Sequence, residues 1–390
     1  MTRIVALMLV FGLSLAMVAA GWAAEANPEE ARAIVEIVKL GGKITVDVKS
    51  PDKPVIGVDL RNTEVIDAGM EHLNGLPRLR SLDLAKTKVT DAGLDLLKGL
   101  TELRSLDVTD TQVTDEGKRK FRQALPHCII HGRAIVDQDS PGKPVTSVYW
   151  GGWLVTDAKM EDIKGLPRLQ SLNLSNANVT DAGLEHLKGL TELRSLNLTW
   201  TGVTDAGLEY LEGLPQLQSL ILHGDNVTDA GLERLKGLTR LQTLDLERTK
   251  VTDMGLERLK GLTRLQSLNL FGTGVTDAGL ERLQGLTNLQ SLDLSHTRVT
   301  DAGLKYLKRL PQLRSLNLWG TKISDVGLEH VKRLPRLQSL ELGRTGVTDA
   351  GPECLRGLTE LRSLGLAETK VTGEGVKKLR QSLPKCQVSH

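Results

Sequence analysis

A nine-residue pattern, L-x-x-L-x-L-x-x-T, recurs along the chain and strongly limits what the chain can fold into. Its first leucine stands at positions 169, 193, 217, 241, 265, 289, 313, 337 and 361, always 24 residues apart. The pattern also occurs at 79 and 103, and degenerate copies begin at Val55 and Val145. These thirteen copies account for most of the 390 residues. A fixed period of this length predicts an extended array of stacked units.

One copy, residues 265–287, shows why the unit cannot fold by itself. Leu268 and Leu270 alternate with polar residues, which predicts a half-buried strand. Leucines recur at a spacing of three over residues 280–286, which predicts a short helix, and Thr276 is suited to cap it. One strand and one short helix cannot bury these leucines alone. Stacked copies bury them between a parallel sheet and a row of helices.

These residues resemble the leucine-rich repeat family. Its signature, L-x-x-L-x-L-x-x-N/C-x-L, is matched from about residue 55 to the end, with threonine mostly in place of asparagine. The resemblance implies an α/β leucine-rich-repeat solenoid, a horseshoe with a parallel concave sheet and short convex helices. The V-T-D-A-G-L half looks like repeats of F-box leucine-rich proteins and of secreted bacterial leucine-rich-repeat proteins. The F-box and its family's repeat cysteine are absent, so ubiquitin-ligase adaptor activity does not carry over.

The first residues have the pattern of an export signal. Arg3 precedes an uncharged run over residues 4–20, and small and then acidic residues follow. This pattern is typical of a secretory signal peptide, with cleavage expected after Ala20 or Ala23. The alternative is an uncleaved membrane anchor, for which the run is at the lower limit of length. We expect a secreted or periplasmic protein of the cell envelope, with no membrane span in the mature chain.

The repeats also predict the domain organisation. We expect a signal peptide over 1–24, an N-terminal cap over 25–54, a first block of three repeats over 55–128, an irregular junction over 129–144, and a second block of ten repeats with a C-terminal cap over 145–390. An amphipathic helix is expected over 28–40 in the N-terminal cap. The two blocks begin and end with similar sequences, which indicates duplication of an ancestral block. We expect one continuous solenoid that bends at the junction.

Two recurring columns have structural explanations. Threonine follows the strand in most copies, as at Thr273, and we expect its hydroxyl to bond the turn backbone of adjacent repeats. Aspartate recurs once per repeat, as at Asp277, where it would complement the helix dipole. The glycine two residues later, such as Gly279, is expected where neighbouring helices approach closely.

Charge and chemistry exclude several classes of function. Lys plus Arg total 50 and Asp plus Glu total 48, which argues against a nucleic-acid partner held by bulk charge. Three cysteines are too few for a disulfide framework or a zinc ribbon. The aspartate column lacks the spacing of calcium-binding solenoids. No acid, base and nucleophile converge in the sequence, so we expect no catalytic residue, no metal and no cofactor.

Strand alternation places three columns of side chains on the concave face. The first is nearly all serine and the second mostly aspartate or asparagine, whereas the third varies most. The departures in the third column and in the position beside it predict a partner site: Trp200, His223, Glu247, Phe271, His296 and Trp319. Exposed rings on a polar sheet favour recognition, and the alternative is packing of the rings on neighbouring side chains.

The sequence therefore predicts an exported, non-enzymatic interaction protein. It would present its concave face to a protein or polysaccharide partner. The alternative is a structural spacer or envelope component without a specific concave ligand, which near-identical repeats would also fit. The aromatic departures favour the interaction protein.

Overall fold

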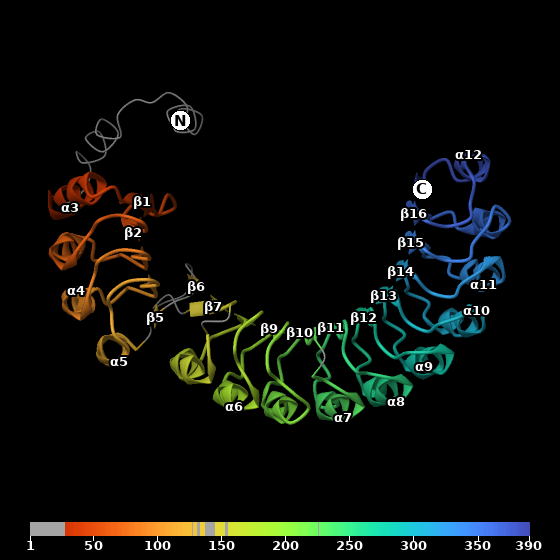
Figure 1. The fold of residues 1–390 in the computed structure, drawn as a ribbon, viewed down its shortest axis with the longest axis horizontal. Coiled ribbons are helices and arrows are strands. Elements are labelled where there is room, and N and C mark those ends of the chain that lie inside the picture. Colours follow the sequence, from red (N-terminus) through yellow and green to blue (C-terminus); the bar gives the residue numbers. More distant parts are fainter. Residues whose placement is uncertain (1–27, 127, 131–132, 137–144, 153–154, 225) are drawn as a thin grey trace. The chain divides into compact units, whose positions relative to one another are not determined.

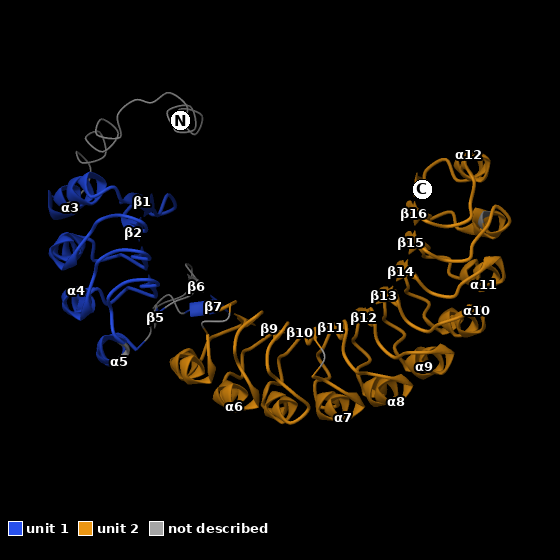
Figure 2. Cartoon of the chain, in the orientation of Figure 1, with its two compact units in different colours: residues 1–149 blue, residues 150–390 orange. Residues whose placement is uncertain are grey.

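The structure is a computed structural model. It describes residues 28–390 apart from 127, 131–132, 137–144, 153–154 and 225. The predicted signal peptide lies outside the described residues. The chain divides into two compact units, residues 1–149 and 150–390, which are coloured separately in Figure 2. No helix in the described part of the chain is both long enough and apolar enough to cross a membrane.

Unit 1 begins with the predicted capping helix, α3 (Pro28–Lys39), which buries Ala33, Ile34 and Ile37. The helix gives way to Gly41, whose φ of 85° suits glycine at a helix end. The strands are β1 (Lys43–Val46), β2 (Val55–Asp59), β3 (Ser81–Asp83), β4 (Ser105–Asp107) and β5 (Ile129–Ile130). β1 pairs antiparallel with β2, and β2 to β5 pair in parallel.

Helical segments and one hairpin complete unit 1. The helical segments are η1 (Asp67–Gly75), α4 (Asp91–Leu96), η2 (Leu97–Gly99) and α5 (Asp115–Ala124). β6 (Arg133–Val136) pairs antiparallel with β7 (Val145–Tyr149). The segment 129–144, which the sequence predicts to be irregular, thus contains the short strands β5 and β6.

Unit 2 is a regular array in which each repeat gives one three-residue strand. These strands are β8 (Ser171–Asn173), β9 (Ser195–Asn197), β10 (Ser219–Ile221), β11 (Thr243–Asp245), β12 (Ser267–Asn269), β13 (Ser291–Asp293), β14 (Ser315–Asn317), β15 (Ser339–Glu341), β16 (Ser363–Gly365) and β17 (Gln387–Ser389). They pair in parallel without any shift in register. In Figure 1 this sheet lines the inner side of the arc of unit 2, and the helices lie outside it.

The outer layer of unit 2 consists of short helical segments. They are η3 (Asp157–Gly165), α6 (Asp181–Leu184), η4 (Glu185–Leu187), η5 (Gly207–Gly213), α7 (Asp229–Leu232), η6 (Glu233–Leu235), α8 (Asp253–Leu256), η7 (Glu257–Gly261), α9 (Asp277–Arg282), η8 (Leu283–Gly285), α10 (Asp301–Leu304), η9 (Lys305–Arg309), α11 (Asp325–Val331), η10 (Gly351–Gly357) and α12 (Gly373–Ser382). Leu268, Leu270 and Leu283 are at most 1% exposed, so sheet and helices share one core. The predicted solenoid is confirmed.

The threonine column bonds differently from the prediction. Each hydroxyl donates to the carbonyl three residues earlier in its own repeat, as Thr273 Oγ1 does to Leu270 O at 2.7 Å. The same bond forms at Thr63, Thr87, Thr111, Thr201, Thr249, Thr297, Thr321, Thr345 and Thr369. The predicted bonds to adjacent repeats are therefore wrong. The hydroxyl closes the turn locally and satisfies a backbone carbonyl where the chain leaves the strand.

Adjacent repeats are joined instead by the aspartate column. Asp253 accepts hydrogen bonds from the backbone N–H of Thr276 at 2.8 Å and from its hydroxyl at 2.6 Å. The Thr276 hydroxyl in turn accepts from Ala278 N–H, which confirms the predicted cap of α9. We call this arrangement the Asp–Thr clamp. The helix dipole alone, as the sequence predicts, accounts for only part of the role of the aspartate.

The clamp recurs through both units and explains the glycine column. Equivalent pairs are Asp67–Thr90, Asp91–Thr114, Asp157–Thr180, Asp181–Thr204, Asp205–Thr228, Asp229–Thr252, Asp277–Thr300, Asp301–Ser324, Asp325–Thr348 and Asp349–Thr372. A Cβ atom on Gly279 would lie 2.4 Å from Asp253 Oδ1, so the clamp requires glycine there. The predicted close approach is confirmed, with the aspartate as the neighbour.

Candidate binding site on the concave face

The second column of the concave face positions the third. Asn269 Oδ1 accepts a hydrogen bond from the backbone N–H of Phe271 at 2.9 Å, and Asn317 Oδ1 accepts one from Trp319 at 3.1 Å. Asp245 does the same for Glu247 at 2.9 Å. A short acid or amide side chain that bonds the backbone two residues on forms a local turn. This column therefore sets the direction of each variable side chain, a role that the sequence analysis did not assign.

The position after the variable column has left-handed backbone. Its φ is 53° at Trp200 and at Arg248, and 55° at His296. The intervening repeats carry Gly224, Gly272 and Gly320 at this position. A non-glycine residue held in this region costs on the order of 1 kcal/mol. The alternating glycines were the sequence signal for this geometry.

Three of the predicted residues form one contact group at the start of the site. The rings of Trp200 and His223 have centroids 4.8 Å apart and are tilted by 46°. His223 Nε2 lies 3.6 Å from Glu247 Oε1. Trp200 is 46% exposed, whereas the side chains of His223 and Glu247 are 18% and 26% exposed. The tryptophan thus stands above a half-buried polar pair.

Arg248 joins this group to the next one. Its Nε is 4.0 Å from Glu247 Oε1, and its guanidinium lies 5.4 Å from the ring centre of Phe271. Phe271 in turn makes an edge contact with His296 at 5.0 Å between centroids. Five of the six predicted residues therefore lie in one continuous line of contacts, with Arg248 as a member that the prediction left out.

Trp319 is placed differently. Its ring covers Gly343 of the next repeat, where a Cβ atom would approach the ring to 2.1 Å. His296 lies over Gly320 in the same way, at 2.9 Å. Bulky side chains on this face thus lean over a glycine of the following repeat. The rings pack on their neighbours, and Trp200 and His296 also remain exposed.

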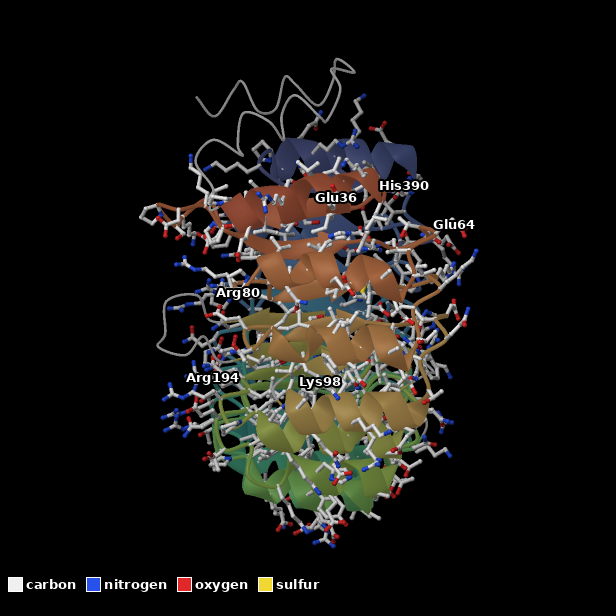
Figure 3. The ribbon with its side chains drawn as sticks, turned by 90° about the vertical axis from the view of Figure 1, so that its left-hand side faces the viewer. Glu36, Glu64, Arg80, Lys98, Arg194 and His390 are labelled. Atoms are coloured by element: carbon white, nitrogen blue, oxygen red, sulfur yellow. The ribbon has the colours of Figure 1, made fainter. Side chains whose placement is uncertain are left out.

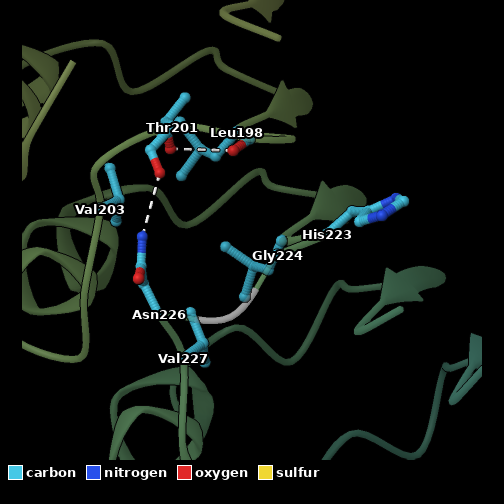
Figure 4. A pocket seen from close by; sticks show the side chains of 8 residues that line it. Leu198, Thr201, Val203, His223, Gly224, Asn226 and Val227 are labelled. Carbon is cyan, nitrogen blue, oxygen red and sulfur yellow. Dashed lines mark hydrogen bonds between the residues drawn. The ribbon is translucent and has the colours of Figure 1, made fainter. Parts of the chain in front are cut away.

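The site is a surface rather than a deep pocket. Figure 4 shows a small cavity beside it, lined by Leu198, Thr201, Val203, Leu222, His223, Gly224, Asn226 and Val227. Asn226 Nδ2 donates to Thr201 O at 3.1 Å across it. Its volume of about 10 Å³ holds at most one water molecule. In the described part of the chain, no group of histidine, cysteine, aspartate and glutamate side chains could hold a metal ion.

The architecture defines an open solenoid of leucine-rich units with a parallel inner sheet. Family models described as leucine rich repeat match residues 76–98, 100–120, 166–188, 190–211, 215–275 and 311–371, and a two-copy model matches 287–333. These matches together cover more than half of the chain. The chain belongs to the leucine-rich repeat superfamily. A comparison with curated protein sequences gives no match.

Solved structures with the same fold come from bacteria and from mouse. An internalin from Listeria monocytogenes is 20% identical with a TM-score of 0.55, covering 91% of this chain and 93% of its own. A leucine-rich repeat protein from Leptospira interrogans is 18% identical with a TM-score of 0.53, covering 82% and 80%. A chain of the mouse RP105/MD-1 complex is 18% identical with a TM-score of 0.52, covering 83% and 56%. At these identities the likeness shows the fold.

Proposed function

We propose that this protein is an exported, non-enzymatic interaction protein that holds a partner protein on the concave face of unit 2. One observation carries the proposal. The residues that break the monotony of the repeat lie in contact with one another, from Trp200 through Arg248 to His296. Independent substitutions on an inert spacer would be scattered over the face. A continuous line of rings and charges is typical of a recognition surface.

We call the six predicted residues together with Arg248 the concave patch. Its composition favours a protein partner over a polysaccharide. Tryptophan and arginine are the residues that most often dominate protein interfaces, and both are present here at exposed positions. The patch spans five repeat steps, roughly 24 Å of sheet, which fits a small domain or an extended segment. The mouse structure named above is itself a complex of two proteins, and the leucine-rich repeat fold supports the general role of a binding scaffold.

Export is part of the proposal and rests on the sequence of residues 1–24. The mature chain recovered from the cell envelope is expected to begin between residues 21 and 25. N-terminal sequencing of the exported protein checks this. A chain that still begins at Met1 would contradict the signal peptide.

Phe271→Ala with Trp319→Ala tests the concave patch. Both side chains are half-buried on the face and not in the leucine core, so the melting temperature should change little. Loss of both rings should abolish capture of the partner from envelope extracts, because aromatic anchors carry most of the binding energy. Quantitative mass spectrometry of captured proteins measures this, and protease treatment of the extract separates protein from polysaccharide partners.

Arg258→Ala is the control for that experiment. Its Nη1 pairs with Glu233 at 2.7 Å on the outer helices, away from the strands. Removing this exposed ion pair should alter neither capture nor melting. If the double variant retains every partner at wild-type affinity, the concave site is wrong and the spacer function is favoured.

A further inference from the structure

The near-zero net charge conceals a basic surface along part of one edge of unit 2, between residues 234 and 338. Five consecutive stretches begin within an outer helical segment and run to the start of the next strand: 234–242, 258–266, 282–290, 306–314 and 330–338. Together they contain thirteen lysines and arginines and no aspartate or glutamate. The aspartates of these repeats lie in the strand, as Asp245 does, or after it at the clamp, and glutamates such as Glu257 lie on the outer helices. No carboxylate lies within these five stretches, and we call the edge that they form the basic edge.

The residues of the basic edge are aligned from one repeat to the next. The strands pair without any register shift, so equivalent residues stand at the same level. Arg314 N–H donates to Gln290 O at 2.8 Å, and Gln338 N–H donates to Arg314 O at 2.7 Å, which continues this alignment to the start of each strand. Figure 3 shows Arg194 at the same strand-start edge and His390 at the opposite edge of unit 2.

Six of the thirteen cations are already paired with carboxylates of the outer helices. These are Arg234, Lys236, Arg258, Lys260, Arg282 and Lys332, bound to Glu212, Glu233, Glu257 or Glu329. The other seven form no ion pair among the described residues, and each is exposed. Six of these seven are arginines. A guanidinium binds phosphate or carboxylate through two parallel hydrogen bonds, which an ammonium group cannot do.

The unpaired cations form two rows. Lys308, Arg309 and Arg333 stand where the helices end. Arg240, Arg264, Arg314 and Arg336 precede the strands. Some of these arginines donate hydrogen bonds to glutamine side chains of the preceding repeat. Arg309 donates to Gln284, and Arg336 donates to Gln312. The charges are therefore spread over a band and held at repeat spacing.

We propose that the basic edge binds the anionic headgroups of a lipid bilayer. A flush band of two rows fits a flat anionic surface, which can meet every cation at once. A linear polyanion such as a nucleic acid or an acidic polysaccharide would follow one row and leave the other unmatched. Each basic residue near an anionic membrane adds to the attraction, and seven are available here. The membrane would then hold unit 2 by its edge and leave the concave patch free.

Vesicle binding tests this with the mature chain. The wild type is mixed with vesicles of equal parts phosphatidylglycerol and phosphatidylcholine, or of phosphatidylcholine alone, and the bound fraction is measured by sedimentation. Binding is expected for the anionic vesicles only and should weaken with salt. Arg309→Gln with Arg333→Gln and Arg336→Gln should lower the partition coefficient by roughly 10- to 100-fold.

The matched control removes three cations from the opposite edge. Lys250→Gln, Arg298→Gln and Lys322→Gln change the net charge equally, at exposed positions that follow the strands. This variant should bind within about twofold of the wild type, because its charges do not face the bilayer. Circular dichroism verifies that both variants fold. If the triple variant of the basic edge does not fold, the single variant Arg314→Gln replaces it.

Three results would overturn the proposal. Failure of the wild type to bind anionic vesicles would remove the basis of the proposal. Equal loss in both triple variants would show attraction by overall charge rather than by the edge. Equal affinity for single-stranded DNA or polygalacturonate at matched charge concentration would show a general polyanion surface. Partner capture on the concave face is unaffected by any of these outcomes, so the two proposals fail separately.

Discussion

The Asp–Thr clamp and the concave patch are built on the same 24-residue repeat. The residues of the clamp are nearly the same in every repeat, whereas those of the patch differ from one repeat to the next. Every clamp uses the same two hydrogen bonds, with Ser324 in place of threonine in one of them, because each aspartate must fit the turn of the next repeat. The patch residues contact their neighbours through side chains that differ from repeat to repeat, as the rings of Trp200 and His223 do. Uniform columns therefore mark contacts that bind the solenoid to itself. Variable columns mark positions that are free to meet something else.

Among the substitutions proposed, Gly279→Ala should reduce the stability of the fold most, because it breaks the clamp. The new Cβ would lie 2.4 Å from Asp253 Oδ1 and 2.8 Å from Val275 Cγ1, so the repeats must separate or the hydrogen bonds must break. We expect a loss of about 1–3 kcal/mol in the free energy of unfolding. Urea denaturation followed by circular dichroism measures it. Partner capture by the folded protein should be unchanged, the reverse of the phenotype expected when Phe271 and Trp319 are removed.

Gly261→Ala is the matched control for the clamp. Apart from its chain neighbours and the backbone of its own helical segment, no atom of the described residues lies within 4 Å of the place where its Cβ would stand, and its backbone is not left-handed. Alanine should be neutral or stabilising by up to about 1 kcal/mol, because it restricts the unfolded chain. If both alanine variants behave alike, the glycine column is not explained by the clamp, and the contrast with the patch loses its basis.

A smaller effect on stability is expected at Glu341, which lies toward the C-terminal end of the concave face. Burial raises the pKa of the Glu341 carboxyl above its ordinary value of 4.5. A raised pKa in the folded state gives stability that is complete below the unfolded pKa and is lost as pH rises through the folded pKa. Glu341→Gln removes the cost of holding a charge at this half-buried position, so its melting temperature should exceed that of the wild type at neutral pH.

The pH profile distinguishes this cause from a general loss of charge. The advantage of Glu341→Gln should shrink as pH falls through the folded pKa and vanish below about 4. Glu281→Gln, at an exposed position on α9, reports the effect of removing one surface charge. Equal pH profiles for the two variants would show that burial of Glu341 does not govern its titration.

The fold was almost fully predictable, because its signals are local. The spacing of leucines gives the strand and helix of each repeat, and Thr276 caps its helix as expected. The partners of the threonine and aspartate columns were not predictable in the same way. Asp253 and Thr276 are 23 residues apart, and only the stacked structure shows that the carboxylate reaches the next turn. Sequence spacing alone favoured the dipole of the aspartate's own helix.

The candidate site was predictable as a set of residues and not as an arrangement. Its six members were found by their departure from the repeat, and five of them lie in one line of contacts. Arg248 was left out although it occupies the same left-handed position as Trp200 and His296, because only the structure shows that its side chain reaches both Glu247 and Phe271. Trp319 lies outside this line of contacts, because its ring packs over Gly343 of the next repeat.

Bulky residues alternate with glycine at the left-handed position, so the concave patch has a period of two repeats rather than one. From Trp200 to Arg344 the left-handed position alternates strictly, and a side chain such as His296 lies over the glycine that follows it. Loss or gain of a single repeat would set two bulky side chains against each other, or two glycines. A change of two repeats, or 48 residues, restores the order. We therefore expect duplication events that lengthen this surface without scrambling it to come in even numbers, so that the gene grows there by pairs of copies.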